Sequence, residues 1–411
     1  MTNQAPKASV TGRGGPSRVR GVLLVVGILL LAANLRPALT ALPPLIGEVR
    51  ADTGVSNGVA GLLTTLPLLA FGLLSPGAPR LARRIGMERA LLASLLVLAA
   101  GILVRSAGPV ALLFVGTAVL GAAIAVGNVL LPGLVKREFP DRAGLATSVY
   151  STAMGVAAAL AAGASFPISQ QTGLGWRASL ALLAVPAVLA AVAWLPLVRG
   201  GGSAKASDRD SRGISLWRSP LAWQVTLFMG LQSLAYYVTL TWLPLILRET
   251  AGLSAAQAGW MLALAQAVGI ASMFLAPLLA GRTPSQRGVL VASVALSGAG
   301  TLGLLVSPGA ATALWVVLIG LGQGACFSLA LTFFALRAPD PEHAAALSGM
   351  AQSVGYLLAA VGPFLFGVLR DATHAWTVPL ALLLAIVSCL MGTGLGAARD
   401  AKVASPPVSR E

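Results

Sequence analysis

Residues 29–40 read LLLAANLRPALT and lie within an apolar run from Gly21 to Ile46. The run is long enough to cross a membrane, because a helix needs about 20 apolar residues to span a bilayer. It nevertheless contains Arg36, and an arginine at the centre of a span costs about 2.5–3.5 kcal/mol on insertion scales. Pro37 follows directly. It lacks an N–H and disrupts the hydrogen bond to the carbonyl of Ala33, so we expect the helix to bend there.

The composition of the chain is that of a membrane protein. Of its 411 residues, 56% are hydrophobic and 10% are charged, and the mean hydropathy is +0.84. Soluble domains average about 25% charged residues. Apolar runs of spanning length recur along the whole chain, and the alternating pattern of barrel strands is absent. We therefore expect an all-α membrane protein with twelve transmembrane helices.

The basic residues predict the orientation of these spans. The net charge is +15, but Lys and Arg are scattered through short loops rather than gathered on one face, which argues against a nucleic-acid partner. With the N-terminus in the cytoplasm, 22 basic residues fall in cytoplasmic segments and five in outer loops. The five are Arg50, Arg105, Arg177, Arg248 and Arg370. This excess predicts a multi-pass protein of the cell membrane with both termini cytoplasmic.

The chain divides into two similar halves. Residues 199–218 read RGGGSAKASDRDSRGISLWR, a composition typical of a flexible linker. We expect a cytoplasmic tail (1–20), a six-helix half (21–198), the cytoplasmic linker (199–218), a second six-helix half (219–398) and a cytoplasmic tail (399–411). The dipeptide Pro-Asp occurs at 140–141 and again at 339–340, 199 positions later. Such spacing indicates duplication and two pseudo-symmetric halves.

Two six-helix halves with a site between them is the layout of major facilitator transporters. The loop PRLARRIGMERA (79–90) resembles their signature loop at Arg84 and Gly86. It departs from the common pattern at Arg83, where that pattern has Asp, and at Met87 and Glu88. The resemblance implies a gating role for Arg84 and Gly86. A plain basic loop on the cytoplasmic side is the alternative.

Several longer stretches resemble the cyanate permease / 2-nitroimidazole transporter (CynX/NimT) branch of that superfamily. They read NLRPALT, GLLTTLPLLAFGLLSP and GNVLLPGLVKREFP in the first half, and GLQSLAYYVTLTWLP, GLGQGACFSLALTFFALRA and GMAQSVGYLLAAVGPFLFGVLRD in the second. Their order covers the chain from about Gly21 to Ala397. The resemblance implies a small solute, often anionic or nitro-bearing, as the substrate.

Arg36 has two interpretations. Its long side chain could extend to the outer surface of the membrane. Alternatively, it faces a central cavity and binds an anion through its planar fork of donors, with Pro37 providing a bend that suits a moving gate. All 13 Asp and Glu fall in loops, tails or span ends. Because no span supplies an acidic partner, the substrate is a candidate counter-ion.

The seventh span holds a second group of polar and aromatic residues. Gln232 and Tyr236 are four residues apart, so they lie along one side of a helix, as do Ser233 and Tyr237. Gln232, Tyr236 and Tyr237 either line the cavity or bond to neighbouring helices. Trp242 is either a ligand-facing ring or an anchor at the membrane interface.

Four further amides lie singly in other spans and are second-rank candidates for the substrate site. Each either lines the cavity or joins two helices. They are Asn128, Gln266, Gln323 and Gln352. The two Cys and two His are isolated and show no metal or redox spacing, so we expect no metal and no cofactor.

These features favour a secondary transporter that moves a small polar or anionic solute by alternating access, acting as a monomer in the lipid bilayer. Efflux of amphipathic drugs is the alternative, and a non-transporting membrane receptor is a more remote one. An intramembrane enzyme would need a nucleophile with a base, or a set of metal ligands. The spans contain no His, Asp or Glu for such a role.

The topology can be tested with reporter fusions at Lys205 and after Glu411. Both should report a cytoplasmic location, because basic residues are retained on that side. An exported C-terminal reporter would mean an odd number of spans and would contradict the division into two equal halves.

Overall fold

The computed structural model describes residues 18–171, 173, 175–200, 216–281 and 285–403. In this part of the chain, twelve helical segments are long and apolar enough to cross a membrane, which confirms the predicted number of spans. The centre of the predicted linker and most of both predicted tails lie outside the described residues.

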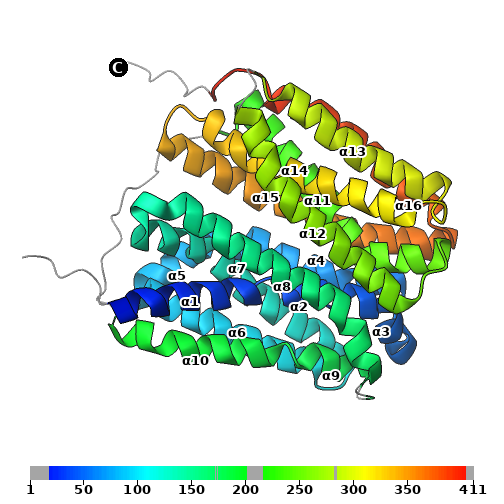
Figure 1. The fold of residues 1–411 in the computed structure, drawn as a ribbon, viewed down its shortest axis with the longest axis horizontal. Helices are drawn as coiled ribbons and strands as arrows, with labels where there is room; N and C mark the ends of the chain where they lie inside the picture. Colours follow the sequence, from blue (N-terminus) through cyan, green and yellow to red (C-terminus); the bar gives the residue numbers. More distant parts are fainter. Residues whose placement is uncertain (1–17, 172, 174, 201–215, 282–284, 404–411) are drawn as a thin grey trace, which may run out of the picture.

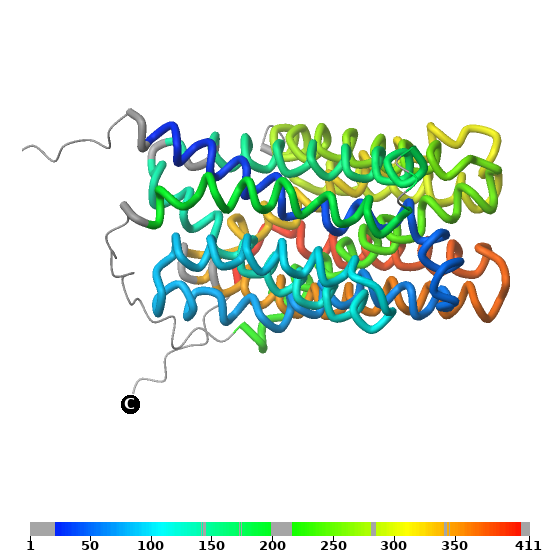
Figure 2. Tube along the Cα trace, turned by 90° about the horizontal axis from the view of Figure 1, so that it is seen from below, coloured from blue at the N-terminus to red at the C-terminus, as the bar shows by residue number. Residues whose placement is uncertain are grey.

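Each half contributes six of these segments (Figures 1 and 2). In the first half the helices are α1 (Arg18–Asn34), α2 (Pro37–Thr40), α3 (Ile46–Thr53), α4 (Asn57–Leu74), α5 (Ala78–Ile85), α6 (Met87–Ser106), α7 (Val110–Glu138), α8 (Ala143–Gln171), α9 (Gly175–Ala181) and α10 (Ala184–Gly200). Short 3₁₀ turns lie at Pro43–Leu45, Ser75–Gly77 and Pro140–Arg142. In the second half they are α11 (Pro220–Thr250), α12 (Ala255–Gly281), α13 (Arg287–Val306), α14 (Thr312–Leu336), α15 (Pro341–Thr373) and α16 (Thr377–Ala397). Figure 2 shows α1 beginning and α10 ending at the same end of the bundle, as an even number of spans requires.

Equivalent turns show that the second half repeats the first. Gly54 before α4 has φ +71°, and Gly252 before α12 has φ +68°. This left-handed conformation is accessible to glycine without steric cost. Two residues later, Ser56 accepts a hydrogen bond from Val59 N, and Ser254 accepts one from Gln257 N. The same glycine and the same cap therefore start the second span of each half.

The two halves meet along two matching helix pairs, α4 with α15 and α8 with α12. Both contacts depend on glycine, because the backbones approach too closely for a side chain. A Cβ on Gly61 of α4 would lie 2.3 Å from the carbonyl oxygen of Pro363. A Cβ on Gly259 of α12 would lie 3.0 Å from that of Ala162. Small residues commonly permit this approach between membrane helices.

At one end of the bundle a carboxylate joins the halves. Asp371, near the end of α15, accepts hydrogen bonds from Asn57 N at 3.1 Å, Asn57 Nδ2 at 2.7 Å and Gly58 N at 2.8 Å. These backbone N–H groups belong to the first turn of α4 and have no partner within that helix. The positive end of the helix dipole also favours an anion there. Asp371 thus closes this end across the interface between the halves.

The structure corrects the placement of Arg105. The sequence puts it in an outer loop, but it lies in the last turn of α6 with 2% of its surface exposed. Its Nη1 donates to the carbonyl oxygen of Ala38 at 2.7 Å. Because α2 ends at Thr40, this carbonyl belongs to the last turn of a helix and needs a donor from elsewhere. Arg105 is therefore buried inside the first half, where it donates a hydrogen bond to the backbone of the broken first span.

We expect Asp371→Ala to loosen the closed end of the bundle. A cysteine replacing Ala162, which is fully buried between α8 and α12, reports the opening through its rate of labelling by a membrane-impermeant maleimide. With Cys326 and Cys389 replaced by Ser, labelling should accelerate several-fold in the Asp371→Ala background.

The control is Glu249→Gln. Glu249 accepts hydrogen bonds from Arg370 and Trp376, all three within the second half, so this change leaves the contact between the halves in place. Equal labelling rates with and without Asp371 would show that its contacts do not hold this end closed.

Candidate functional site

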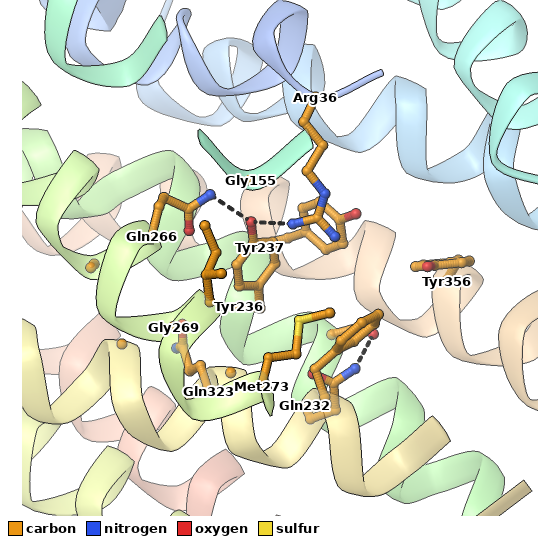
Figure 3. Close-up of a pocket in the computed structure, with 16 residues that line it drawn as sticks. Arg36, Gly155, Gln232, Tyr236, Tyr237, Gln266, Gly269, Met273, Gln323 and Tyr356 are labelled. Atoms are coloured by element: carbon orange, nitrogen blue, oxygen red, sulfur yellow. Dashed lines mark hydrogen bonds between the residues drawn. The ribbon is translucent and has the colours of Figure 1, made fainter. Parts of the chain in front are cut away.

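The first span is broken at Arg36. Helix α1 ends at Asn34, and α2 begins at Pro37, so the predicted break at the proline is present. Arg36 lies between the two helices and its side chain extends toward the second half. Its Nη1 donates to the hydroxyl oxygen of Tyr236 on α11 at 3.0 Å, and its guanidinium carbon is 5.7 Å from the centre of that ring. Arg36 is therefore held between the halves rather than at the membrane surface (Figure 3).

Tyr236 connects three elements. Besides the bond from Arg36, its hydroxyl accepts one from Gln266 Nε2 of α12 at 2.9 Å (Figure 3). A chain of two hydrogen bonds thus runs from the first half to two helices of the second. The Tyr237 ring packs edge-on against the Tyr236 ring, with their centres 5.0 Å apart.

Two connected cavities meet at this chain of hydrogen bonds. The smaller has a volume of about 70 Å³ and lies against α11, α12 and α14, and the larger, of about 450 Å³, lies between the halves. The larger cavity reaches Ser75 at the end of α4 and Thr147 near the start of α8. Both cavities are lined by Arg36, Tyr236, Tyr237, Met273, Phe327 and Tyr356. Among the described residues, neither is lined by a carboxylate.

Three of the predicted amides line the smaller cavity. Gln232 Nε2 donates to Ser233 Oγ at 2.7 Å and contacts Met229 Sδ at 3.3 Å. Gln323 Nε2, on α14, donates to Thr239 Oγ1 at 2.9 Å and to the carbonyl oxygen of Ala235 at 3.3 Å. The sequence left two alternatives for these amides, lining the cavity or bonding to neighbouring protein groups. Both apply, because each amide bonds to protein and also faces the cavity.

The other two amides line the larger cavity. Asn128 of α7 and Gln352 of α15 both face it, and Gln352 Nε2 donates to Ser348 Oγ at 2.8 Å within its own helix. Tyr356 lines both cavities and Tyr150 lines the larger one, and the sequence analysis missed both. A signal existed for Tyr356, since it lies four residues after Gln352 on the same side of α15.

Four predicted residues line neither cavity: Trp242, Arg84, Gly86 and Pro37. The structure corrects Trp242: its ring is fully buried and its Nε1 donates to the carbonyl oxygen of Pro363 at 3.0 Å, so it joins α11 to α15. It is an anchor neither for ligand nor for the membrane surface. Arg84 lies in the last turn of α5, and Gly86 joins α5 to α6 with φ +91°, a conformation that favours glycine. Their gating role stays a prediction, as does that of Pro37.

The polar groups of the site suit a neutral or anionic ligand. Arg36 keeps Nε and Nη2 without an acceptor among the described residues, and both cavities are walled by aromatic rings. A guanidinium presents two parallel N–H groups to a pair of oxygens. Without a carboxylate nearby, a cationic ligand would face Arg36 with no compensating charge.

Two repeated six-helix halves enclosing a polar cavity at their interface form a secondary transporter. The chain belongs to the Major Facilitator Superfamily, whose family model matches residues 23–363, and within it to the cyanate permease / 2-nitroimidazole transporter (CynX/NimT) branch.

Two relatives illustrate this membership. The chain is 47% identical over 397 residues to the 2-nitroimidazole transporter of Escherichia coli (strain K12), covering 96% of this chain and 99% of the relative. It is 30% identical over 384 residues to the cyanate transport protein CynX of the same organism, covering 93% and 98%. The nucleoside transporter NupG has the same fold, with a TM-score of 0.76 at 11% identity over 92% of this chain and 100% of that one. The protein is thus a transporter of small solutes.

We expect Tyr236→Phe to weaken substrate binding while membrane levels stay near normal. The change removes the hydroxyl that orients Arg36 and Gln266. A hydrogen bond to a charged group contributes roughly 1.5–3 kcal/mol, so a partial loss of orientation should lower the affinity by about threefold to tenfold. Apparent affinity is measured by uptake of labelled solute into proteoliposomes.

Trp242→Phe is the matched control, since it removes a ring N–H outside both cavities. Its apparent affinity should stay near that of the wild type. Unchanged affinity in Tyr236→Phe, measured at equal protein levels, would exclude Tyr236 from the site.

Proposed function

We propose that this transporter moves a small planar solute bearing an anionic or nitro group, and that Arg36 is its principal contact. The solute's oxygens would accept hydrogen bonds from Nε and Nη2 of Arg36, the two nitrogens that Tyr236 leaves free. The aromatic rings of the cavity would cover the flat faces of the solute.

One observation carries this proposal: the guanidinium of Arg36 lies in a cavity that has no carboxylate among its described lining residues. A charge within the membrane is expensive and normally has a partner. The hydroxyl of Tyr236 solvates it but leaves its charge uncompensated. An anionic or strongly dipolar solute supplies what the protein does not.

The named relatives support the same class of solute. One is a 2-nitroimidazole transporter and another a cyanate transport protein, and both names describe small molecules with a negative or strongly polar end. The fixed charge of Arg36 in the site favours a small polar solute over amphipathic drugs, which were the alternative from the sequence. The named relatives are transporters rather than enzymes, and we propose no enzymatic activity.

The direction of the halves in the membrane follows from the basic residues. We place the protein in the cell membrane. Both terminal tails and the linker 199–218 then lie in the cytoplasm. The end closed by Asp371 then faces outward, and the larger cavity extends toward the cytoplasm. The described state would be the one that receives or releases solute on the inner side, with the protein acting as a monomer.

We expect Arg36→Ala to abolish specific uptake. The protein should still insert into the membrane, because a costly charge is removed from the span. Loss of a charge-assisted contact of roughly 1.5–3 kcal/mol lowers affinity about tenfold to hundredfold. Arg36→Lys should be impaired as well, since a point charge cannot reproduce two parallel donors. The measurement is uptake of labelled 2-nitroimidazole, normalised to protein in the membrane.

Arg177→Ala is the matched control. Arg177 pairs with Asp52 and lies over the Trp176 ring, outside both cavities, so its loss should leave uptake unchanged. Full activity in Arg36→Lys with only a mild loss in Arg36→Ala would overturn the assignment of Arg36 as the anion contact.

A further inference from the structure

We infer that the smaller cavity recognises a hydrogen-bond donor on the solute, through the amide oxygens of Gln323 and Gln232. The inference rests on the proposed function, since it concerns the same site. It adds a second requirement to the substrate class: opposite its nitro or anionic end, the solute carries an N–H group.

The orientation of Gln323 is fixed by its partner on α11. Its Nε2 lies 3.3 Å from the carbonyl oxygen of Ala235, and a backbone carbonyl can only accept a hydrogen bond. The nitrogen must therefore point to α11, and it also reaches Thr239 Oγ1 at 2.9 Å. The oxygen Oε1 is the remaining end of the amide, and the side chain lines the cavity.

Gln232 has the same arrangement. Its Nε2 donates to Ser233 Oγ and contacts Met229 Sδ, and a thioether sulfur can only accept. Gln266 differs, because its partner is the hydroxyl of Tyr236, and a hydroxyl can donate to an amide oxygen as well as accept from an amide nitrogen. Within the described part of the chain, no group donates a hydrogen bond to Oε1 of Gln232 or Gln323, and neither oxygen is sealed from the cavity. The compartment therefore offers two acceptors whose own N–H groups are already in use.

This pattern separates the site into two ends. Arg36 offers N–H donors at one end, and Gln323 and Gln232, which lie farther from it in Figure 3 than Gln266 does, offer oxygens at the other. A solute with acceptors at both ends would leave the amide oxygens unpaired, and each unsatisfied buried polar group costs about 1–3 kcal/mol. A solute with an acceptor end and an N–H end satisfies both.

The walls of the compartment hold these oxygens in place and limit what fits. Helices α12 and α14 pack so closely that a Cβ on Gly324 would lie 2.1 Å from the carbonyl oxygen of Gly269 and 2.4 Å from Ser272 Oγ. The space enclosed is about 70 Å³, enough for the edge of a small ring. Rigid helices hold binding groups more accurately than loops do, so the acceptors can discriminate between similar solutes.

Three small nitroaromatic probes test the inference on the purified full-length protein. They are 2-nitroimidazole and two isomeric methyl derivatives, the C-methyl compound 4-methyl-2-nitroimidazole and the N-methyl compound 1-methyl-2-nitroimidazole. The two methyl compounds have the same size, but only the second lacks the N–H. Affinity is measured by ligand-dependent thermal stabilisation, at a pH acidic enough for the ring to keep its proton. We expect the N-methyl compound to bind at least about tenfold more weakly than the C-methyl isomer.

A pair of glutamine variants locates the effect. In Gln323→Met the preference for the C-methyl isomer should shrink several-fold, because the acceptor is gone while the side chain keeps its length. Gln257→Met is the matched control: this amide accepts a hydrogen bond from Ser254 N at the exposed start of α12 and lines neither cavity. Its preference should equal that of the wild type.

Equal binding of the two methyl isomers to the wild type would overturn the inference, as would an unchanged preference in Gln323→Met. If the probes bind with dependence on Arg36 but without regard to the N–H, only this inference fails. If none of the probes binds, or if binding is insensitive to Arg36→Ala, the proposed function fails with it.

Discussion

The hydrogen bond between Arg36 and Tyr236 is the contact around which the rest of the site is arranged. A guanidinium inside a membrane bundle must be hydrated or bonded, and here one hydroxyl and a cavity do both. The two residues are 200 positions apart, which matches the spacing of the internal repeat. They are therefore near-equivalent positions on the first spans of the two halves. Such positions meet at the axis that relates the halves, which explains how a residue from each half reaches the same point.

The repeat is symmetric in its packing and asymmetric in how its helix ends are satisfied. Gly61 and Gly259 occupy matching positions and allow matching helix pairs to touch. At the start of α12, Ser254 and Gln257 exchange hydrogen bonds and complete the cap within the same half. At the start of α4, Asp371 from the other half completes the cap. Among the described residues, the contact between α8 and α12 rests on packing, whereas the contact between α4 and α15 also includes a carboxylate that water can replace when the halves separate.

The sequence predicted those features of the fold and the site that depend on neighbouring residues in the chain. Span number follows from apolar length, and the break at Arg36 follows from proline chemistry, so both were predictable. The direction in which a side chain points was not, because these helices are apolar on nearly every face and no polar stripe marks the cavity. Trp242 was misplaced for this reason, since its ring and Tyr236 share a helix but point to different neighbours. Arg105 was misplaced because a charged residue near the end of a span is usually assigned to a loop. In the structure, the broken first span provides the buried carbonyl oxygen of Ala38, to which Arg105 donates a hydrogen bond.

The position of the site on the repeat axis also bears on how transport would proceed. When two halves rock about an axis, residues on that axis move least, and the outlying pairs α4–α15 and α8–α12 move most. Contacts made by Arg36 and Gln323 to a bound solute would then persist while access changes from one end to the other. A bound anion would compensate the charge of Arg36 during this movement. The empty protein would instead carry an uncompensated guanidinium in a narrowing cavity. As water leaves this cavity, the unfavourable electrostatic free energy of the unpaired charge increases. If Arg36 binds the solute as proposed, closure about an occupied site is favoured over closure about an empty one, and this difference would link the movement of the halves to the movement of the solute.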